Sequence, residues 1–163
     1  MPEKVKALFI FEIMGRPPEH IKKSLEELID KLGKQKGIKI IRKEIHEPKK
    51  LEENKNAKVI MGEDFFTAFA EVELITDNID LVYAIVLNML PAHIEIIEPS
   101  EYKFSNFELS SMLTDLAVKI HKYDEIAKIL MIERKNLLDK LGETEERVKE
   151  LEKEIKDGVY LGK

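Results

Sequence analysis

The sequence has no cysteine, no tryptophan and a single glutamine, Gln35, among its 163 residues. The absence of cysteine excludes disulfides, thiolate metal sites and cysteine nucleophiles. Neither glycine-rich phosphate-binding motif, GxGxxG or GxxxxGKS/T, occurs in the chain. No apolar run approaches the roughly 20 residues of a membrane span, and the N-terminus lacks the cleavage pattern of a signal peptide. We therefore expect a cytoplasmic protein with no membrane partner.

Charge is plentiful and unevenly distributed. Charged residues make up 36% of the chain, whereas roughly 25% is ordinary, which favours long solvated helical faces. The 24 glutamates and 23 lysines match the composition of thermophile proteins. Residues 1–60 hold 15 basic and 10 acidic side chains, and residues 61–163 hold 12 and 22. A basic half can mark a face for an anionic partner, unless folding mixes the two halves.

Alternating apolar residues predict four strands, at 5–14, 38–45, 64–75 and 93–98. Helical spacing predicts one helix that ends at Gly33 and a second over 78–90, with Asp77 as its cap. The order β-α-β-β-α-β over about 95 residues is that of a ferredoxin-like α+β domain. We expect this domain at 1–100, a helical extension at 105–157 and a mobile tail at 158–163.

A long helix is predicted to begin at the capping box formed by Ser105 and Glu108. From Ile120 to Ile155 apolar residues alternate at spacings of three and four, which satisfies a heptad seam for about five repeats. Gly142 costs about 1 kcal/mol in a helix interior. We expect a break or kink there, so the extension is either a coiled coil or a helical hairpin.

Three groups of residues are candidate sites, and no residue pattern indicates catalysis or a metal centre. The loop after the first strand combines an arginine with a helix N-terminus, which suits an anionic ligand. Its candidate residues are Gly15, Arg16, Glu19 and His20. The candidate nucleic-acid residues are Lys22, Lys23, Lys34, Lys36 and Arg42. The candidate oligomer interface consists of Phe107, Leu113, Leu116, Ile120, Leu130 and Leu137.

The sequence resembles two protein families. The run Met14-Gly15-Arg16-Pro17-Pro18, then a helix, then Gly37-Ile38-Lys39-Ile40 resembles the ACT domain, a ferredoxin-like module that binds small regulatory ligands. Residues 88–96 are similar to the second-helix exit and last strand of that domain. The whole chain also resembles an uncharacterised archaeal protein family with a GRPPEH-like loop and a helical tail. The ACT likeness implies domains that pair with one another.

The sequence favours a non-catalytic, self-associating interaction or regulatory module that forms a homodimer and needs no cofactor. One alternative is a factor that binds the ribosome or RNA, or a ribonucleoprotein partner, through the basic N-terminal half. The other alternative is an ACT-like small-ligand sensor.

Overall fold

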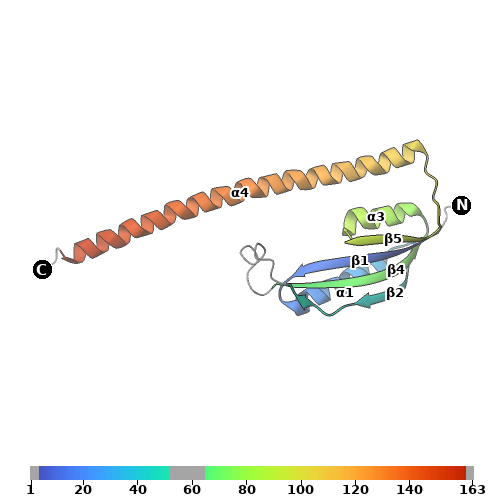
Figure 1. Cartoon of the computed structure of the whole chain (residues 1–163), viewed down its shortest axis with the longest axis horizontal. Helices are drawn as coiled ribbons and strands as arrows, with labels where there is room; N and C mark the ends of the chain where they lie inside the picture. The colour runs from blue at the N-terminus through green and yellow to red at the C-terminus, as the bar shows by residue number, and fades with distance from the viewer. Residues whose placement is uncertain (1–3, 52–64, 161–163) are drawn as a thin grey trace. The chain divides into compact units, whose positions relative to one another are not determined.

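The structure is a computed structural model that describes residues 4–51 and 65–160 (Figure 1). It divides into two compact units, Met1–Leu109 and Ser110–Lys163. The first unit contains an α+β domain built on a five-stranded antiparallel sheet. The second unit is formed by most of one long helix, α4 (Asn106–Tyr160). The α+β class expected from the sequence is confirmed.

The sheet is organised around β1, which lies between β4 and β5. Its strand order is β2-β4-β1-β5, with β3 paired to β4. The short β3 adds one strand to the expected β-α-β-β-α-β order, and its two polar residues give no apolar alternation from which to predict it. The strands are β1 (Val5–Gly15), β2 (Ile38–Ile45), β3 (Lys49–Lys50), β4 (Phe66–Thr76) and β5 (His93–Glu98).

The strand register shows how the two central strands pair. Val5 pairs with Thr76 and Gly15 pairs with Phe66, so β1 and β4 run antiparallel along their full lengths. The β2–β4 register shifts between Ile40 and Arg42, which indicates a bulge at Ile41. One face of the sheet packs in the core. Its fully buried members are Val5, Ala7, Phe9, Ala68, Ala70, Val72 and Leu74.

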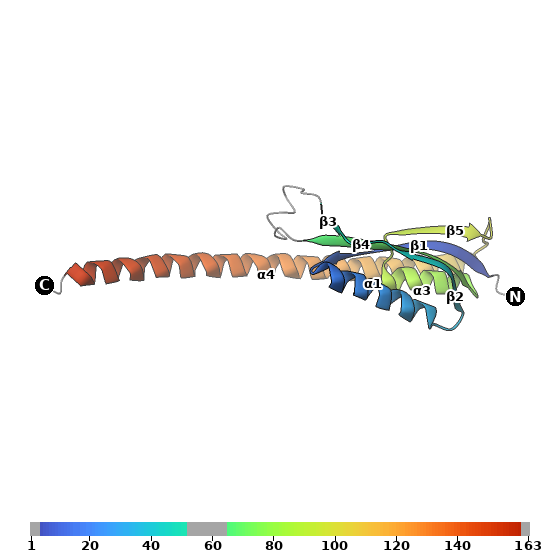
Figure 2. The same cartoon turned by 90° about the horizontal axis from the view of Figure 1, so that it is seen from below.

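Two helices cover that buried face (Figure 2). The first, α1 (Pro18–Gly33), buries an apolar stripe at helical spacing, as predicted. The second is α3 (Ile79–Met89), and its N-cap is Asn78, not the expected Asp77: the Asn78 side chain accepts a hydrogen bond from the Leu81 N–H at 3.0 Å. The core residues of the helices are Ile21, Leu25, Ile29, Leu32, Val82 and Ile85.

The helix α4 is continuous for 55 residues. The break or kink expected at Gly142 is wrong, and so is the helical hairpin. One glycine lowers helix propensity by about 1 kcal/mol, which neighbouring turns can offset in so long a helix. The residues 158–160 of the expected mobile tail belong to α4, and residues 161–163 lie outside the described part of the chain.

A connection of seven residues, 99–105, joins β5 to α4. Tyr102 is packed against the domain core, and its ring lies 5.0 Å from that of Phe104. At the end of the connection, Ser105 and Glu108 form the predicted capping box. The Glu108 N–H donates to Ser105 Oγ at 3.2 Å, and the Ser105 N–H donates to Glu108 Oε2 at 2.8 Å. The bond from the Ser105 N–H, together with one from the Ser105 hydroxyl to the same carboxylate, holds the Glu108 pKa below its ordinary value, and the capping box fixes where the helix begins.

Candidate functional site

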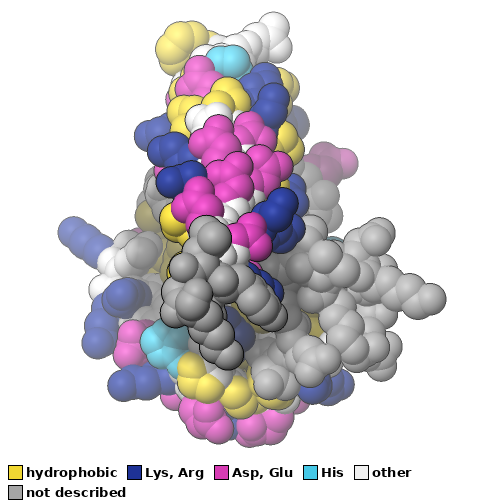
Figure 3. Space-filling view, turned by 90° about the vertical axis from the view of Figure 1, so that its left-hand side faces the viewer, with side chains coloured by type: hydrophobic (Ala, Val, Ile, Leu, Met, Phe, Trp, Pro, Cys, Tyr) yellow, Lys and Arg dark blue, Asp and Glu magenta, His cyan; other side chains and the backbone are white. Residues whose placement is uncertain are grey.

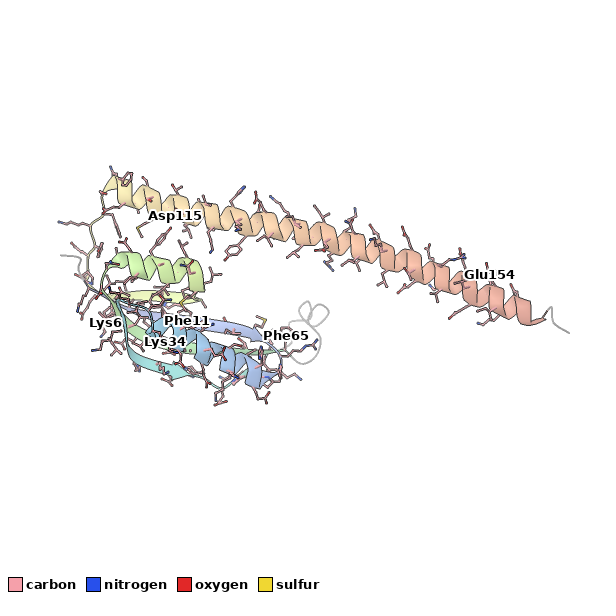
Figure 4. All side chains as sticks on the ribbon, turned by 180° about the vertical axis from the view of Figure 1, so that it is seen from behind. Lys6, Phe11, Lys34, Phe65, Asp115 and Glu154 are labelled. Carbon is pink, nitrogen blue, oxygen red and sulfur yellow. The ribbon has the colours of Figure 1, made fainter. Side chains whose placement is uncertain are left out.

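The strongest candidate surface is the apolar seam along α4. The six residues expected to form an oligomer interface lie on this helix, and all are exposed, from 36% at Leu116 to 82% at Phe107. Apolar side chains that point into water along a helix are stabilised only when another surface covers them. Figure 4 shows side chains projecting around α4 over its whole length, between the labelled Asp115 and Glu154.

Helical continuity extends the seam beyond the stretch seen from sequence. The sequence predicts the heptad pattern from Ile120 to Ile155, and on the continuous helix the same register also runs back to Leu109. Phe107 lies outside this register. The signal that could have found the longer seam is the same spacing of three and four, at Leu109, Leu113 and Leu116. The a positions are 113, 120, 127, 134, 141, 148 and 155, and the d positions are 109, 116, 123, 130, 137, 144 and 151.

Two polar residues interrupt the seam, Arg134 at an a position and Thr144 at a d position. Near the first, a shallow and mainly apolar depression lies on the helix surface. Its lining residues are Leu130, Glu133, Arg134, Leu137, Leu138 and Leu141. The Thr144 hydroxyl donates to the Lys140 carbonyl oxygen at 2.8 Å, so this hydroxyl has a hydrogen-bond partner within its own helix.

Off the seam, the α4 surface carries many charged side chains, together with exposed apolar ones such as Val118, Ile129 and Ile132. The Lys128 ammonium lies 2.6 Å from the Asp124 carboxylate, and Arg147 lies 3.1 Å from Glu150. Such pairs, three or four residues apart, each contribute a few tenths of a kcal/mol to a helix. Figure 3 shows acidic side chains gathered along one line of the helix, with lysines and arginines beside them. The helix therefore has an apolar seam, and its remaining surface is mixed, with charged side chains over most of its length and an apolar stretch at 126–132.

The loop from Gly15 to His20 is held tightly at both ends. A Cβ added at Gly15 would lie 3.0 Å from Ile21 Cγ2, and the Arg16 guanidinium lies 6.0 Å from the centroid of the Phe65 ring. The Pro17 carbonyl oxygen accepts the backbone N–H groups of His20 and Ile21. Glu19 and His20 are exposed on the first turn of α1.

A shallow groove lies beside the first turns of α1. Three carboxylates and two ammonium groups line it together with two prolines, so its charge disfavours an anionic ligand. One of the lysines, Lys22, is hydrogen-bonded to Glu47, and this bond raises the Lys22 pKa. The lining residues are Pro18, Glu19, Lys22, Lys23, Glu26, Glu47 and Pro48.

The five basic residues expected to contact nucleic acid are spread over three segments. Lys22 and Lys23 lie on α1, Lys34 and Lys36 follow its C-terminal end, and Arg42 lies on β2. The Arg42 guanidinium faces the Glu73 carboxylate at 3.8 Å. Since Lys22 also has a carboxylate partner, two of the five charges are already partly neutralised within the domain.

The sheet face opposite the helices carries paired polar groups among apolar ones. Lys6 Nζ lies 2.8 Å from Glu73 Oε1, and their hydrogen bond raises the Lys6 pKa and lowers the Glu73 pKa. The Thr67 hydroxyl donates to Glu12 at 2.7 Å. These bonds cross from β1 to β4 and stabilise the pairing of the two central strands.

His46 forms a small cluster at one end of that face. Its ring stacks on Phe69 with centroids 4.1 Å apart, and its Nε2 lies 3.5 Å from Glu71 and 4.0 Å from Glu44. His46 thus lies next to Glu44 of β2 and to Phe69 and Glu71 of β4. In residues 4–51 and 65–160, no group of three or more His, Asp or Glu side chains is arranged to hold a metal ion.

Among the described residues, no helix combines the length and the apolar character needed to cross a bilayer. Searches of curated proteins and of solved structures returned no match to the chain. A comparison with protein families matches residues 6–159 to the MJ0538 family. This match covers the α+β domain and nearly all of α4, so the chain belongs to the MJ0538 family.

Proposed function

We propose that this protein is a non-catalytic, self-associating interaction module in which α4 pairs with α4 of a second copy. The observation that supports the proposal is the uninterrupted 55-residue helix with an apolar seam exposed along it. The helix extends about 80 Å at 1.5 Å per residue. A helix in water owes most of its stability to packing of its apolar face against another surface. A second copy of α4 would supply such a surface along the full seam.

The energetic argument rests on the leucines and isoleucines of the seam. Fully burying one such side chain contributes roughly 1.5–3 kcal/mol. Leu130 and Leu137 are 56% and 62% exposed, so most of that contribution is still to be gained when a partner covers them. The lysines and glutamates outside the seam remain in water when the two helices pair.

The proposal is tested by replacing Leu130 and Leu137 together with aspartate. We expect the wild-type chain to have about twice its 18.9 kDa mass in light scattering and the variant to be monomeric, because two buried carboxylates per helix would be unpaired. A dimeric variant, or a monomeric wild type, contradicts the proposal.

A matched control uses the same chemical change elsewhere on the same helix. Ile129 and Ile132 are 63% and 62% exposed, and both lie outside the a and d positions. Replacing both with aspartate lowers helix propensity in the same way but leaves the seam intact. This control variant should remain dimeric, which separates loss of the seam from loss of the helix.

We also propose that the α+β domain is a ferredoxin-like domain in which β3 is an addition. The order β2-β4-β1-β5, with α1 and α3 on one face, supports this assignment. RNA binding and ACT-like ligand sensing stay predictions. The carboxylate partners of Lys22 and Arg42 weigh against the first, and the acidic groove beside α1 weighs against an anionic ligand for the second.

A further inference from the structure

We infer that the two α4 helices pair parallel and in register, so that each seam residue faces its own copy. The inference rests on the proposed self-association through α4 and specifies the geometry of the partner. It is carried by the charges that flank the seam, at the e and g positions of the heptad. In two-stranded coiled coils these positions determine orientation, because their side chains meet across the seam.

Parallel pairing brings each g residue opposite the e residue five positions later on the partner helix. In α4 this rule joins Lys119 to Asp124, Lys140 to Glu145 and Arg147 to Glu152. All three pairs have opposite charges, and no g–e pair in the described helix has like charges. Asp124 and Arg147 also have partners on their own helix, so in the pair each would be shared between a residue of its own helix and one of the second copy.

Antiparallel pairing would bring e opposite e and g opposite g. The charged e residues of the described helix are Asp124, Glu145 and Glu152, and all three are acidic. Every charged e–e contact in an antiparallel pair is therefore repulsive. The charged g residues are of both signs, since Lys119, Lys140 and Arg147 are basic and Glu133 and Glu154 are acidic, so the discrimination comes from the e positions. The charge pattern consequently discriminates against the antiparallel arrangement.

The polar seam residues argue for exact register. Parallel chains in register place Arg134 beside Arg134 of the second copy and Thr144 beside Thr144, so each polar layer contains only polar residues. The neighbouring Glu133 lies at the preceding g position, within reach of the second copy's Arg134. A shift by one heptad would place Arg134 against Ala127 or Leu141 and bury an unpaired charge, which is costly.

Single cysteines test the inference directly, because the natural chain has none. Leu116→Cys and Thr144→Cys each place one thiol at a d position, where parallel chains in register bring two copies within disulfide distance. The two positions are separated by about 42 Å along the helix. We expect both full-length variants, in a glutathione redox buffer, to form covalent dimers in non-reducing electrophoresis. Glu146→Cys, on the outer face, should stay uncrosslinked.

The possible outcomes distinguish parallel pairing from self-association itself. An antiparallel pair has one two-fold axis, so at most one of the two d-position variants could crosslink to itself. A dimeric mass with only one or neither variant crosslinked overturns parallel pairing while self-association stands. A monomeric wild type in light scattering overturns both. Circular dichroism of each variant establishes that α4 is still helical when the crosslink is scored.

Discussion

At the scale of single residues, two glycines differ in what surrounds them. Gly37 has φ +83°, and a Cβ there would lie 2.8 Å from Leu81 Cδ1 and 3.0 Å from the Asp77 carboxylate. The Asp77 N–H also donates to the Gly37 carbonyl oxygen at 2.9 Å, which ties the start of β2 to the end of β4. Gly142 has helical geometry and open space around it.

We expect Gly37→Ala and Gly142→Ala to change stability in opposite directions. The first should lower the free energy of unfolding by about 1–2 kcal/mol or more, because alanine is strained at positive φ and its Cβ crowds Leu81. The second should stabilise α4 by about 1 kcal/mol. Urea unfolding followed by circular dichroism measures both, and a neutral Gly37→Ala would contradict the packing described for this turn.

The ion pair between Lys6 and Glu73 should make stability depend on pH. The hydrogen bond from Lys6, aided by the charges of Lys6 and Arg42, lowers the Glu73 pKa from its ordinary 4.5. This contribution is present above pH 4.5 and is lost as the pH falls through the lowered pKa. The Lys6 contribution, whose pKa is raised, is present below 10.5 and lost as the pH rises above that value.

Glu73→Gln tests the acid side of this dependence. We expect its deficit in the free energy of unfolding to be constant near neutrality and to shrink below pH 4.5, because the wild type then loses the same ion pair. Lys6→Met is the matched variant and should lose the same acid-dependent share. Urea titrations at a series of pH values decide the matter, and a deficit that is independent of pH would show that the pair contributes nothing.

At the scale of elements, regular alternation of apolar and polar residues predicts a strand, whereas a short polar strand leaves no such pattern in the sequence. The faces of β1 and β4 could be predicted because Phe9, Phe11 and Val72 recur with period two. By contrast β3 exists only through its pairing with β4, which a local pattern does not record. The helix cap at Asn78 was missed because Asp77 is an equally good capping residue by type.

The features of the candidate sites likewise differ in whether the sequence could predict them. The α4 seam could be read from spacing alone, since consecutive heptad positions are local in sequence. The stacking of His46 on Phe69 depends on the register between β2 and β4, which lie far apart in the chain. The ion partner of Lys22, Glu47, likewise comes from 25 residues away. Contacts between segments far apart in the chain therefore cannot be predicted from the local pattern of residues.

Substitution of Arg134 tests whether this residue lies in the seam through which α4 is proposed to pair. We expect Arg134→Leu to tighten self-association by at least about tenfold, because it replaces a polar layer with an apolar one. Sedimentation equilibrium measures the dissociation constant. Lys135→Leu, the same kind of change at the adjacent position off the seam, should leave the constant nearly unchanged. Equal effects of the two substitutions would argue against the a-position assignment of Arg134.

At the scale of the whole molecule, the two compact units should unfold separately. The α+β domain has its own core, so its melting temperature should not depend on protein concentration. The proposed pairing of α4 is bimolecular, so the melting temperature of the helical signal should rise over an about hundredfold increase in concentration. Calorimetry and circular dichroism at the two extremes check this, and a helical transition that ignores concentration would contradict pairing.

The short connection between β5 and α4 has a consequence for what the α+β domains experience. Seven residues span at most about 25 Å, and parallel helices would start side by side. Each domain would then meet its copy at an effective concentration in the millimolar range, whatever the concentration of the protein in solution. A contact between the two domains too weak to hold free subunits together would be occupied in the dimer, so α4 would act as a tether as much as an interface.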